Sequence, residues 1–487
     1  MRGNPHRIFC QPSRIPVQAL SGFHFYKDSF IICDCFAQNP SIMVRTIFKW
    51  GLIITLSMSC RQKETPNTGM VENGERDSLE TLADTYLRKL TSLDQFNGAI
   101  LLKKDGEVLL EKAYNMTSDS SSTLYVTRES QFDLRSVAKL FARVAVLQLE
   151  KEGKLSREDS IGTYLSGFPN GAKITIQHLL DHTSGLPREF NDSIGNTLSL
   201  SPDEVIALAS REPLEFEPGS REQYSNVGFQ LLYYIIGKVS GGSFSDYLKK
   251  NVFSPLGMKA SGGNFDSDLS HLTKYAYGHY WDQDKNLRTE KTFPPDDMKM
   301  GNLHATVEDL DRFLTSLDPE VYESLSDKGS ISHAGGTRGK RAYVERNYKE
   351  DYSIVFLANY DGIPFERMVS DLQKLLTGQP VSMPERVQRQ PVEIAPEILQ
   401  QYEGTYDFVE AGHLLLTIRL EQDSLWVYQK GQNNGVLYPE SESVFFGDPT
   451  SRESLEFVPD GSGGFHALLD FQGVQWKGVK VPSKEED

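Results

Sequence analysis

The chain has 487 residues, a formal net charge of −16 at pH 7 and four cysteines. Its length predicts two or three domains, and its acidity argues against nucleic acid or an anionic membrane surface as a partner. No cysteine follows Cys60, so the rest of the chain has no disulfide, no thiol nucleophile and no cysteine metal site.

Residues 43–60 have the pattern of a secretory signal, with a basic start, a short apolar run and small residues before a cysteine. The run is too short for a membrane-spanning helix. The cysteine resembles a bacterial lipoprotein site, which predicts that Cys60 is lipidated and that the protein is exported to the periplasm or outer envelope. A cleaved or membrane-anchoring signal is the alternative.

We therefore interpret residues 1–59 as a signal region, within which residues 1–42 are an extension ahead of the true start at Met43. Residues 60–76 are polar and predict a flexible tether. Apolar residues then recur at helical spacing over 79–90. Residues 99–110 predict a β-hairpin with Asp-Gly as its turn.

A serine and a lysine lie three positions apart at the start of a mostly apolar stretch, residues 137–149, that predicts a buried helix. This spacing puts the side chains of Ser136 and Lys139 on one face, about one turn apart. A lysine whose pKa is lowered by burial can take the proton of a serine nucleophile. The bland alternative is a capping serine and a solvated lysine.

Two histidines, His178 and His182, follow in a short predicted helix that ends near Gly185 and Pro187. Their spacing could suit zinc, but no third ligand stands at metal spacing, so we interpret them as structural and expect no metal. Further along, Tyr224 and Asn226 stand where a Pro-Gly turn enters an apolar helix. Polar groups there can face a cleft, or be a packed tyrosine and a helix cap.

Residues 331–339 are rich in glycine and precede two predicted strands, 341–346 and 352–358. They include His333, and their glycines allow the backbone to approach a ligand closely. A final amphipathic helix is predicted over 365–376, followed by a proline-rich linker. Beyond the linker the apolar pattern changes to period two over several short strands, which predicts a small antiparallel barrel or sandwich.

Three motifs occur in order: Ser136-x-x-Lys139, Tyr224-x-Asn226 and His333-x-Gly335. Together with the surrounding sequence they resemble the serine β-lactamase and penicillin-binding-protein-like hydrolases, in the branch of class C lactamases, D,D-peptidases and esterases. The resemblance implies an α/β (α+β) fold in which an antiparallel sheet is flanked by helices. It implies a hydrolase domain over residues 77–378, a linker over 379–395 and a lipocalin-like β-barrel over 396–487.

The resemblance also implies acyl transfer without a cofactor, on a small-molecule or peptide substrate. Ser136 would be the nucleophile, and Lys139 and Tyr224 would share the acid–base work, with the choice between them open. Asn226, His333, Gly335 and Gly336 would bind substrate, with the backbone N–H groups of Ser136 and Gly336 as the oxyanion hole.

Arg338 is a candidate for binding a substrate carboxylate, with a solvated surface arginine as the alternative. Neutral His333 stands where lactamases have a charged lysine, which favours esters or D-amino-acid peptides over lactams as substrates. Three other functions stay open at this point. They are a non-catalytic penicillin-binding or sensor module, a weak β-lactamase, and a carrier whose barrel binds an apolar ligand.

Overall fold

The computed structural model describes residues 69–190, 200–263, 272, 274–282, 285–290, 299–318, 322–411, 413–429, 431–471 and 474–481. The predicted signal region and Cys60 lie outside these residues. The described residues divide into a larger unit, within 69–280 and 287–385, and a smaller unit, within 281–286 and 386–481. Among the described residues, no helix has the length and apolar character needed to cross a bilayer.

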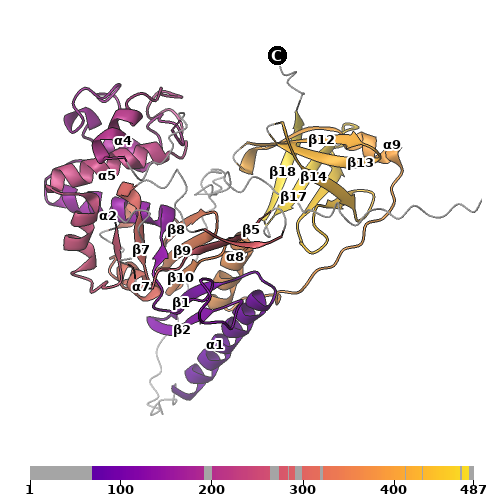
Figure 1. Ribbon diagram of the computed structural model, residues 1–487, viewed down its shortest axis with the longest axis horizontal. Coiled ribbons are helices and arrows are strands. Elements are labelled where there is room, and N and C mark those ends of the chain that lie inside the picture. Colours follow the sequence, from indigo (N-terminus) through magenta and orange to yellow (C-terminus); the bar gives the residue numbers. More distant parts are fainter. Residues whose placement is uncertain are drawn as a thin grey trace, which may run out of the picture. The chain divides into compact units, whose positions relative to one another are not determined.

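A five-stranded antiparallel sheet with the order β2-β1-β10-β9-β8 is the centre of the larger unit (Figure 1). The N-terminal and C-terminal parts of the larger unit meet in the middle of this sheet, where Gly98 of β1 pairs with Ala358 of β10. The predicted hairpin is confirmed, with Asp105 and Gly106 at its turn. The strands are β1 (Gly98–Lys104), β2 (Glu107–Tyr114), β8 (Ser330–Thr337), β9 (Lys340–Asn347) and β10 (Tyr352–Ala358).

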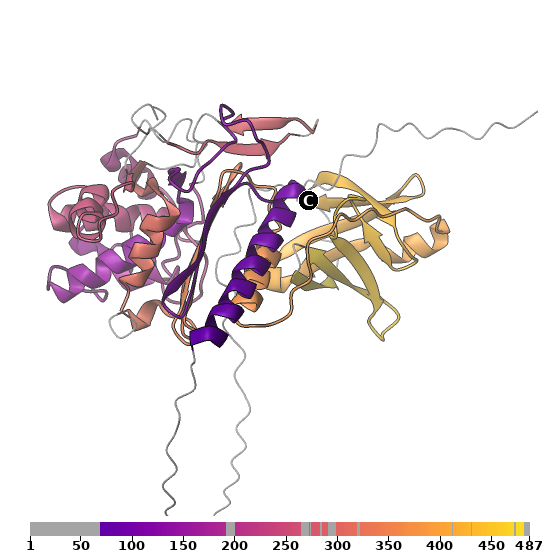
Figure 2. The same ribbon diagram turned by 90° about the horizontal axis from the view of Figure 1, so that it is seen from below.

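One face of this sheet is covered by α1 (Gly69–Ser92) and α8 (Phe365–Leu376). Figure 2 shows α1 lying along the sheet. The helices are joined by a buried hydrogen bond in which the Tyr86 hydroxyl donates to Asp371 Oδ2 over 2.8 Å. The prediction of α8 is confirmed residue for residue, whereas α1 begins inside the stretch predicted as a tether.

The opposite face packs on the main helical core. Within that core, Phe141 of α2 stacks on Phe313 of α7 with ring centroids 3.9 Å apart. This core positions the start of α2 against the sheet. Its helices are α2 (Ala138–Lys151), α3 (Ile176–Leu180), α4 (Pro202–Ala209), α5 (Asn226–Ser240), α6 (Phe244–Leu248) and α7 (Val307–Thr315).

Short strands extend the larger unit beside this core. One small sheet has the order β3-β7-β4 and another pairs β5 with β6. Leu134, between β3 and α2, donates its backbone N–H to Leu303 O over 2.8 Å, which fixes the segment before α2. The strands are β3 (Phe132–Asp133), β4 (Gly262–Gly263), β5 (Gly278–Trp281), β6 (Leu287–Glu290) and β7 (Leu303–Ala305).

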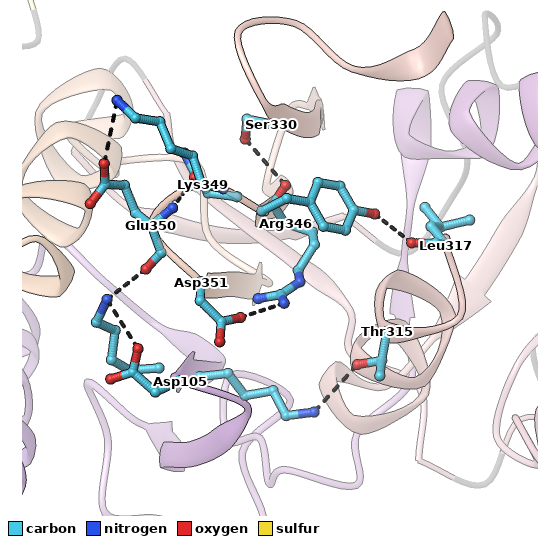
Figure 3. Close-up of polar contacts among 12 residues, drawn as sticks. Asp105, Thr315, Leu317, Ser330, Arg346, Lys349, Glu350 and Asp351 are labelled. Carbon is cyan, nitrogen blue, oxygen red and sulfur yellow. Dashed lines mark hydrogen bonds and ion pairs between the residues drawn. The ribbon is translucent and has the colours of Figure 1, made fainter. Parts of the chain in front are cut away.

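Polar contacts fix the turn between β9 and β10 at one end of the sheet (Figure 3). Arg346 pairs with Asp351 across the turn. The Tyr348 hydroxyl donates to Leu317 O over 2.6 Å, just beyond α7. Lys103 of β1 donates to the Thr315 hydroxyl over 3.3 Å. These contacts hold α7 on the sheet. The candidate site lies near the opposite end of β8.

The smaller unit contains a closed eight-stranded antiparallel barrel, in which β11 pairs with both β12 and β18. The predicted small C-terminal antiparallel β-barrel is confirmed. Tyr402 stacks on Phe457 with ring centroids 4.3 Å apart. The strands are β11 (Gly404–Phe408), β12 (Leu414–Glu421), β13 (Ser424–Gln429), β14 (Gln432–Pro439), β15 (Val444–Phe446), β16 (Ser454–Pro459), β17 (Phe465–Phe471) and β18 (Val474–Val481).

Candidate active site

Ser136 lies in a single 3₁₀ turn, η3 (Arg135–Val137), that leads directly into α2. The sequence predicted that the serine opens the α-helix itself; the structure instead makes Val137 the helix cap, without a side-chain capping bond. Arg135 has a φ of 50°, a left-handed conformation that non-glycine residues rarely adopt. Such strain persists where surrounding contacts enforce it, and it is common at active sites.

The predicted trio of Ser136, Lys139 and Tyr224 meets in space. Lys139 Nζ lies 3.2 Å from Ser136 Oγ, and the Tyr224 hydroxyl donates to the same oxygen over 2.9 Å. Ser136 and Lys139 are buried, at 7% and 5% exposure. The lysine Nζ also lies 5.0 Å from the centre of the Tyr224 ring. One serine oxygen therefore contacts two groups that can exchange a proton with it.

Tyr224 is held by a histidine and by the cap of α5. The rings of His182 and Tyr224 stack with their centroids 4.4 Å apart. The backbone N–H of Ser225 donates to His182 Nδ1 over 3.0 Å, and the Ser225 hydroxyl caps α5 by accepting from Gly228 N. His182 thus packs under the tyrosine, in the structural role expected for it.

Asn226 is the first residue of α5 rather than its cap, because Ser225 takes the capping position. Its side-chain amide donates to Glu189 Oε1 over 2.5 Å. Arg188, next to that glutamate, lies with its guanidinium carbon 5.0 Å from the centre of the Tyr224 ring. Arg188, on the loop after α3, therefore lies against the Tyr224 ring, while Asn226 stands at the start of α5.

The glycine-rich stretch, for which the sequence predicted no strand, forms strand β8, which pairs with β9 along its whole length. A Cβ on Gly335 would lie 2.4 Å from Leu134 O and 3.0 Å from Ser136 N. Only a residue without a side chain lets β8 approach the serine backbone this closely. Gly336 follows in the same strand, opposite Arg341.

His333 also lies on β8, and its ring is 5% exposed. Its Nδ1 contacts Ala334 O over 2.8 Å, a carbonyl that can only accept, so the imidazole carries its proton there. Burial, followed by the positive charges of Arg143 and Lys139, lowers the pKa of His333 to about 3. Its other nitrogen is then an uncharged acceptor at neutral pH.

Sequence reasoning missed an ionic network behind the serine. The buried Lys340 Nζ contacts Asp133 Oδ2 over 3.1 Å and the Tyr275 hydroxyl over 2.9 Å. Asp133 Oδ1 accepts the backbone N–H of Arg135 over 3.1 Å. Burial alone would raise the pKa of Asp133, but Lys340 and Arg135 outweigh it and lower that pKa. This network holds the strained residue that precedes Ser136.

Arg338 has a carboxylate partner within the protein. Its guanidinium contacts Glu290 Oε2 over 2.6 Å and lies over the Tyr280 ring, with half of the side chain exposed. The predicted role in binding a substrate carboxylate would require this pair to open. Among the described residues, no group of three potential metal ligands comes together.

Residues 88–329 match the family model named Beta-lactamase. Penicillin-binding protein 4* of Bacillus subtilis is 27% identical over 430 residues, which cover 77% of this chain and 92% of that protein. A solved structure of the octameric penicillin-binding protein homologue from Pyrococcus abyssi is similar, with a TM-score of 0.55 at 23% identity, covering 83% of this chain and 99% of that one.

The fold also resembles a D-amino acid amidase from Ochrobactrum anthropi, with a TM-score of 0.50 at 18% identity, over 63% of this chain and 98% of the amidase. At such identities, the structural likenesses concern the fold. The family model and the B. subtilis relative, in contrast, match the amino-acid sequence of this chain. Residues 88–329 therefore carry a domain of the Beta-lactamase family, and the B. subtilis relative extends the likeness over 77% of the chain.

Proposed function

We propose that the protein is a serine hydrolase that cleaves an ester or the amide of a D-amino acid through an acyl-enzyme. The observation that carries this proposal is the meeting of Lys139 Nζ and the Tyr224 hydroxyl on Ser136 Oγ, at 3.2 and 2.9 Å. A serine hydroxyl becomes an effective nucleophile only when an adjacent base takes its proton.

In the first step, Ser136 Oγ attacks the substrate carbonyl and its proton passes to the Lys139–Tyr224 pair. The carbonyl oxygen becomes an oxyanion, which the backbone N–H groups of Ser136 and Gly336 would stabilise. The close approach of β8 at Gly335 supports this assignment, because it brings that strand to the serine backbone. The pair then protonates the leaving alcohol or amine, and the acyl-enzyme remains.

In the second step, water attacks the acyl carbonyl while the pair accepts a proton from that water. The tetrahedral intermediate collapses, the proton returns to Ser136 Oγ, and the carboxylic acid leaves. Asn226 and His333 would position the substrate beside the nucleophile. Asn226 stands at the start of α5, and His333 stands on the strand of Gly335.

The substrate class follows from the charge at His333. A lysine there would give a permanent positive charge for the carboxylate of a lactam. The buried imidazole, with its pKa lowered to about 3, gives only a hydrogen-bonding group at neutral pH. We therefore expect neutral esters or D-amino-acid amides to react faster than lactams.

The test is labelling with an acylating probe, followed by mapping of the adduct and kinetics on a panel of esters, D-peptides and lactams. The probe should label Ser136, and Ser136→Ala should abolish labelling and turnover while the circular dichroism spectrum stays unchanged. An adduct on another serine would refute the nucleophile. A burst without steady turnover would favour a non-catalytic binding module, and faster lactam hydrolysis would favour a lactamase.

We also propose that the chain is exported and anchored in the cell envelope by lipid on Cys60. The support is the signal-like sequence of residues 43–60. Expressed from Met43 in a bacterial host, the protein should fractionate with membranes, and Cys60→Ser should release or mislocalise it. A cytosolic product with an unmodified Cys60, detected by mass spectrometry, would contradict the proposal.

A further inference from the structure

The nucleophile helix carries a second cation. Apart from Lys139, Arg143 is the only charged residue between Val137 and Leu149. It stands four positions after Lys139, and residues four apart on a helix lie on the same face, with Cβ atoms about 6 Å apart. An arginine inside this otherwise apolar helix therefore lies one turn behind the lysine that contacts Ser136.

Arg143 is only partly solvated and is held in place. One terminal nitrogen donates to Leu180 O over 2.9 Å, at the end of α3. Its Nε is buried without a hydrogen-bond partner. Leu180 O is a neutral carbonyl partner, which does not compensate the charge. The guanidinium therefore keeps its positive charge, because an arginine stays protonated in proteins.

The positive charge of Arg143 acts on both histidines of the site. The pKa of His182 is lowered to about 2, first by burial and then by the positive charge of Arg143. The same two causes, in the same order, lower the pKa of His333. These rings lie on different elements, the loop after α3 and strand β8.

We propose that Arg143 is an electrostatic positioning residue, whose fixed positive charge keeps the proton-accepting group beside Ser136 unprotonated. The inference rests on the function proposed above. It does not depend on which group accepts the proton, because a nearby cation disfavours a lysine ammonium and favours a tyrosine phenolate. In both cases the base is ready to accept a proton at lower pH.

Two neutral histidines and a second cation, Arg188, also lie around the base, and the charge of Arg188 likewise lowers the pKa of His182. His182 and His333 are neutral at pH 7, since the pKa of each is lowered far below that value. Arg188 lies over the Tyr224 ring from the loop, where it also contacts Glu189 over 3.8 Å. Arg143 is the cation on the same helix face as Lys139, held there by Leu180 O.

The test compares wild type, Arg143→Gln and Arg143→Lys in the rate of Ser136 acylation as a function of pH. Glutamine keeps a donor for Leu180 O but removes the charge, whereas lysine keeps the charge. The acid limb of the Arg143→Gln profile should move to higher pH by roughly one unit. The Arg143→Lys profile should stay within a few tenths of a unit of wild type.

A second readout does not involve activity. In an NMR titration of the imidazole resonances, Arg143→Gln should raise the pKa of both His182 and His333, and Arg143→Lys should not. Superimposed acylation profiles and unchanged histidine titrations in a folded Arg143→Gln protein would overturn the inference. Failure of the proposed function itself looks different, because wild type would then show no acylation of Ser136 at any pH.

Discussion

Two buried lysines flank the nucleophile segment, and their surroundings differ. Lys340 and Lys139 are 4% and 5% exposed. Lys340 contacts the Asp133 carboxylate, which outweighs the effect of burial and raises the pKa of the lysine. Lys139 contacts the Ser136 hydroxyl and the faces of two aromatic rings, with Arg143 on the same helix. A carboxylate fixes a buried ammonium, whereas a hydroxyl and a second cation suit a group that gives up its proton.

The largest effect is expected on the Lys139 side. Lys139→Met should lower the acylation rate of Ser136 by about 10³-fold, because general-base assistance is worth 10²–10⁴. The free energy of unfolding should not fall, since the substitution replaces a buried amine with an apolar side chain of similar length. Stopped-flow acylation and urea unfolding measure the two quantities. The control is Lys151→Met at the exposed end of α2, and an active Lys139→Met protein would break the comparison.

Substitution of Lys340 should instead lower the stability of the fold. Lys340→Met leaves the Asp133 carboxylate buried with a weaker set of partners, so the free energy of unfolding should fall by about 3 kcal/mol. The double variant Asp133→Asn/Lys340→Met should regain part of this loss, because the stranded charge is gone. Urea denaturation at pH 7 measures both. A fully stable single variant would show that the pair does not hold this segment.

The pH dependence of stability separates the two sides further. The lowered pKa of Asp133 and the raised pKa of Lys340 give a contribution that is present between about pH 4 and pH 10 and is lost outside that window. His182 and His333 act between those limits. Unfolding frees both rings to bind protons below about pH 6.5, so stability should fall as pH drops from 6.5.

That slope should approach two protons, or about 2.7 kcal/mol per pH unit, between pH 6 and pH 4. His333→Gln should reduce it by about one proton, as measured by urea unfolding at a series of pH values. Replacement of the exposed His413 is the control and should leave the slope as it is. A wild-type stability that is flat from pH 7 to pH 4 would contradict the burial of neutral imidazoles.

A neutral change can disturb the Lys139 side without touching a charge. Gly335→Ala would place a Cβ 2.4 Å from Leu134 O and push β8 away from Ser136 N. We expect the acylation rate to fall by roughly 10²-fold, the size of a lost oxyanion-hole donor. Gly336→Ala meets only the side chain of Arg341, which can move, and should cost less. Equal losses in the two variants would argue against the close approach at Gly335.

The smallest effect is expected at the surface pair of Arg338 and Glu290. The arginine side chain is half exposed, so Arg338→Ala should change the free energy of unfolding by less than about 1 kcal/mol. If the arginine binds a substrate carboxylate, KM should rise for anionic substrates and stay the same for neutral esters. Steady-state kinetics with a matched pair of substrates measures this.

The sequence predicted what short spacing determines. Ser136 and Lys139 are three residues apart, so one helical turn brings them together. The two ends of the Lys340–Asp133 pair are 207 residues apart, and each reads as an ordinary surface charge until the fold joins them. Strand β8 was missed because its glycines have no strand propensity and are used for close approach. The sequence shows Arg143 as a charged residue within an apolar run. The direction of its side chain is set by the hydrogen bond to Leu180 O, which the sequence does not show.

The pairing of β1 with β10 has a consequence for the order in which the chain can fold. Gly98 of β1 pairs with Ala358 of β10, so the middle of the sheet is incomplete until most of the larger unit has been synthesised. The barrel likewise closes through β18, its last strand. Contacts between such distant residues slow folding. Folding of either unit therefore cannot be completed before a late strand, β10 in the sheet or β18 in the barrel, is available.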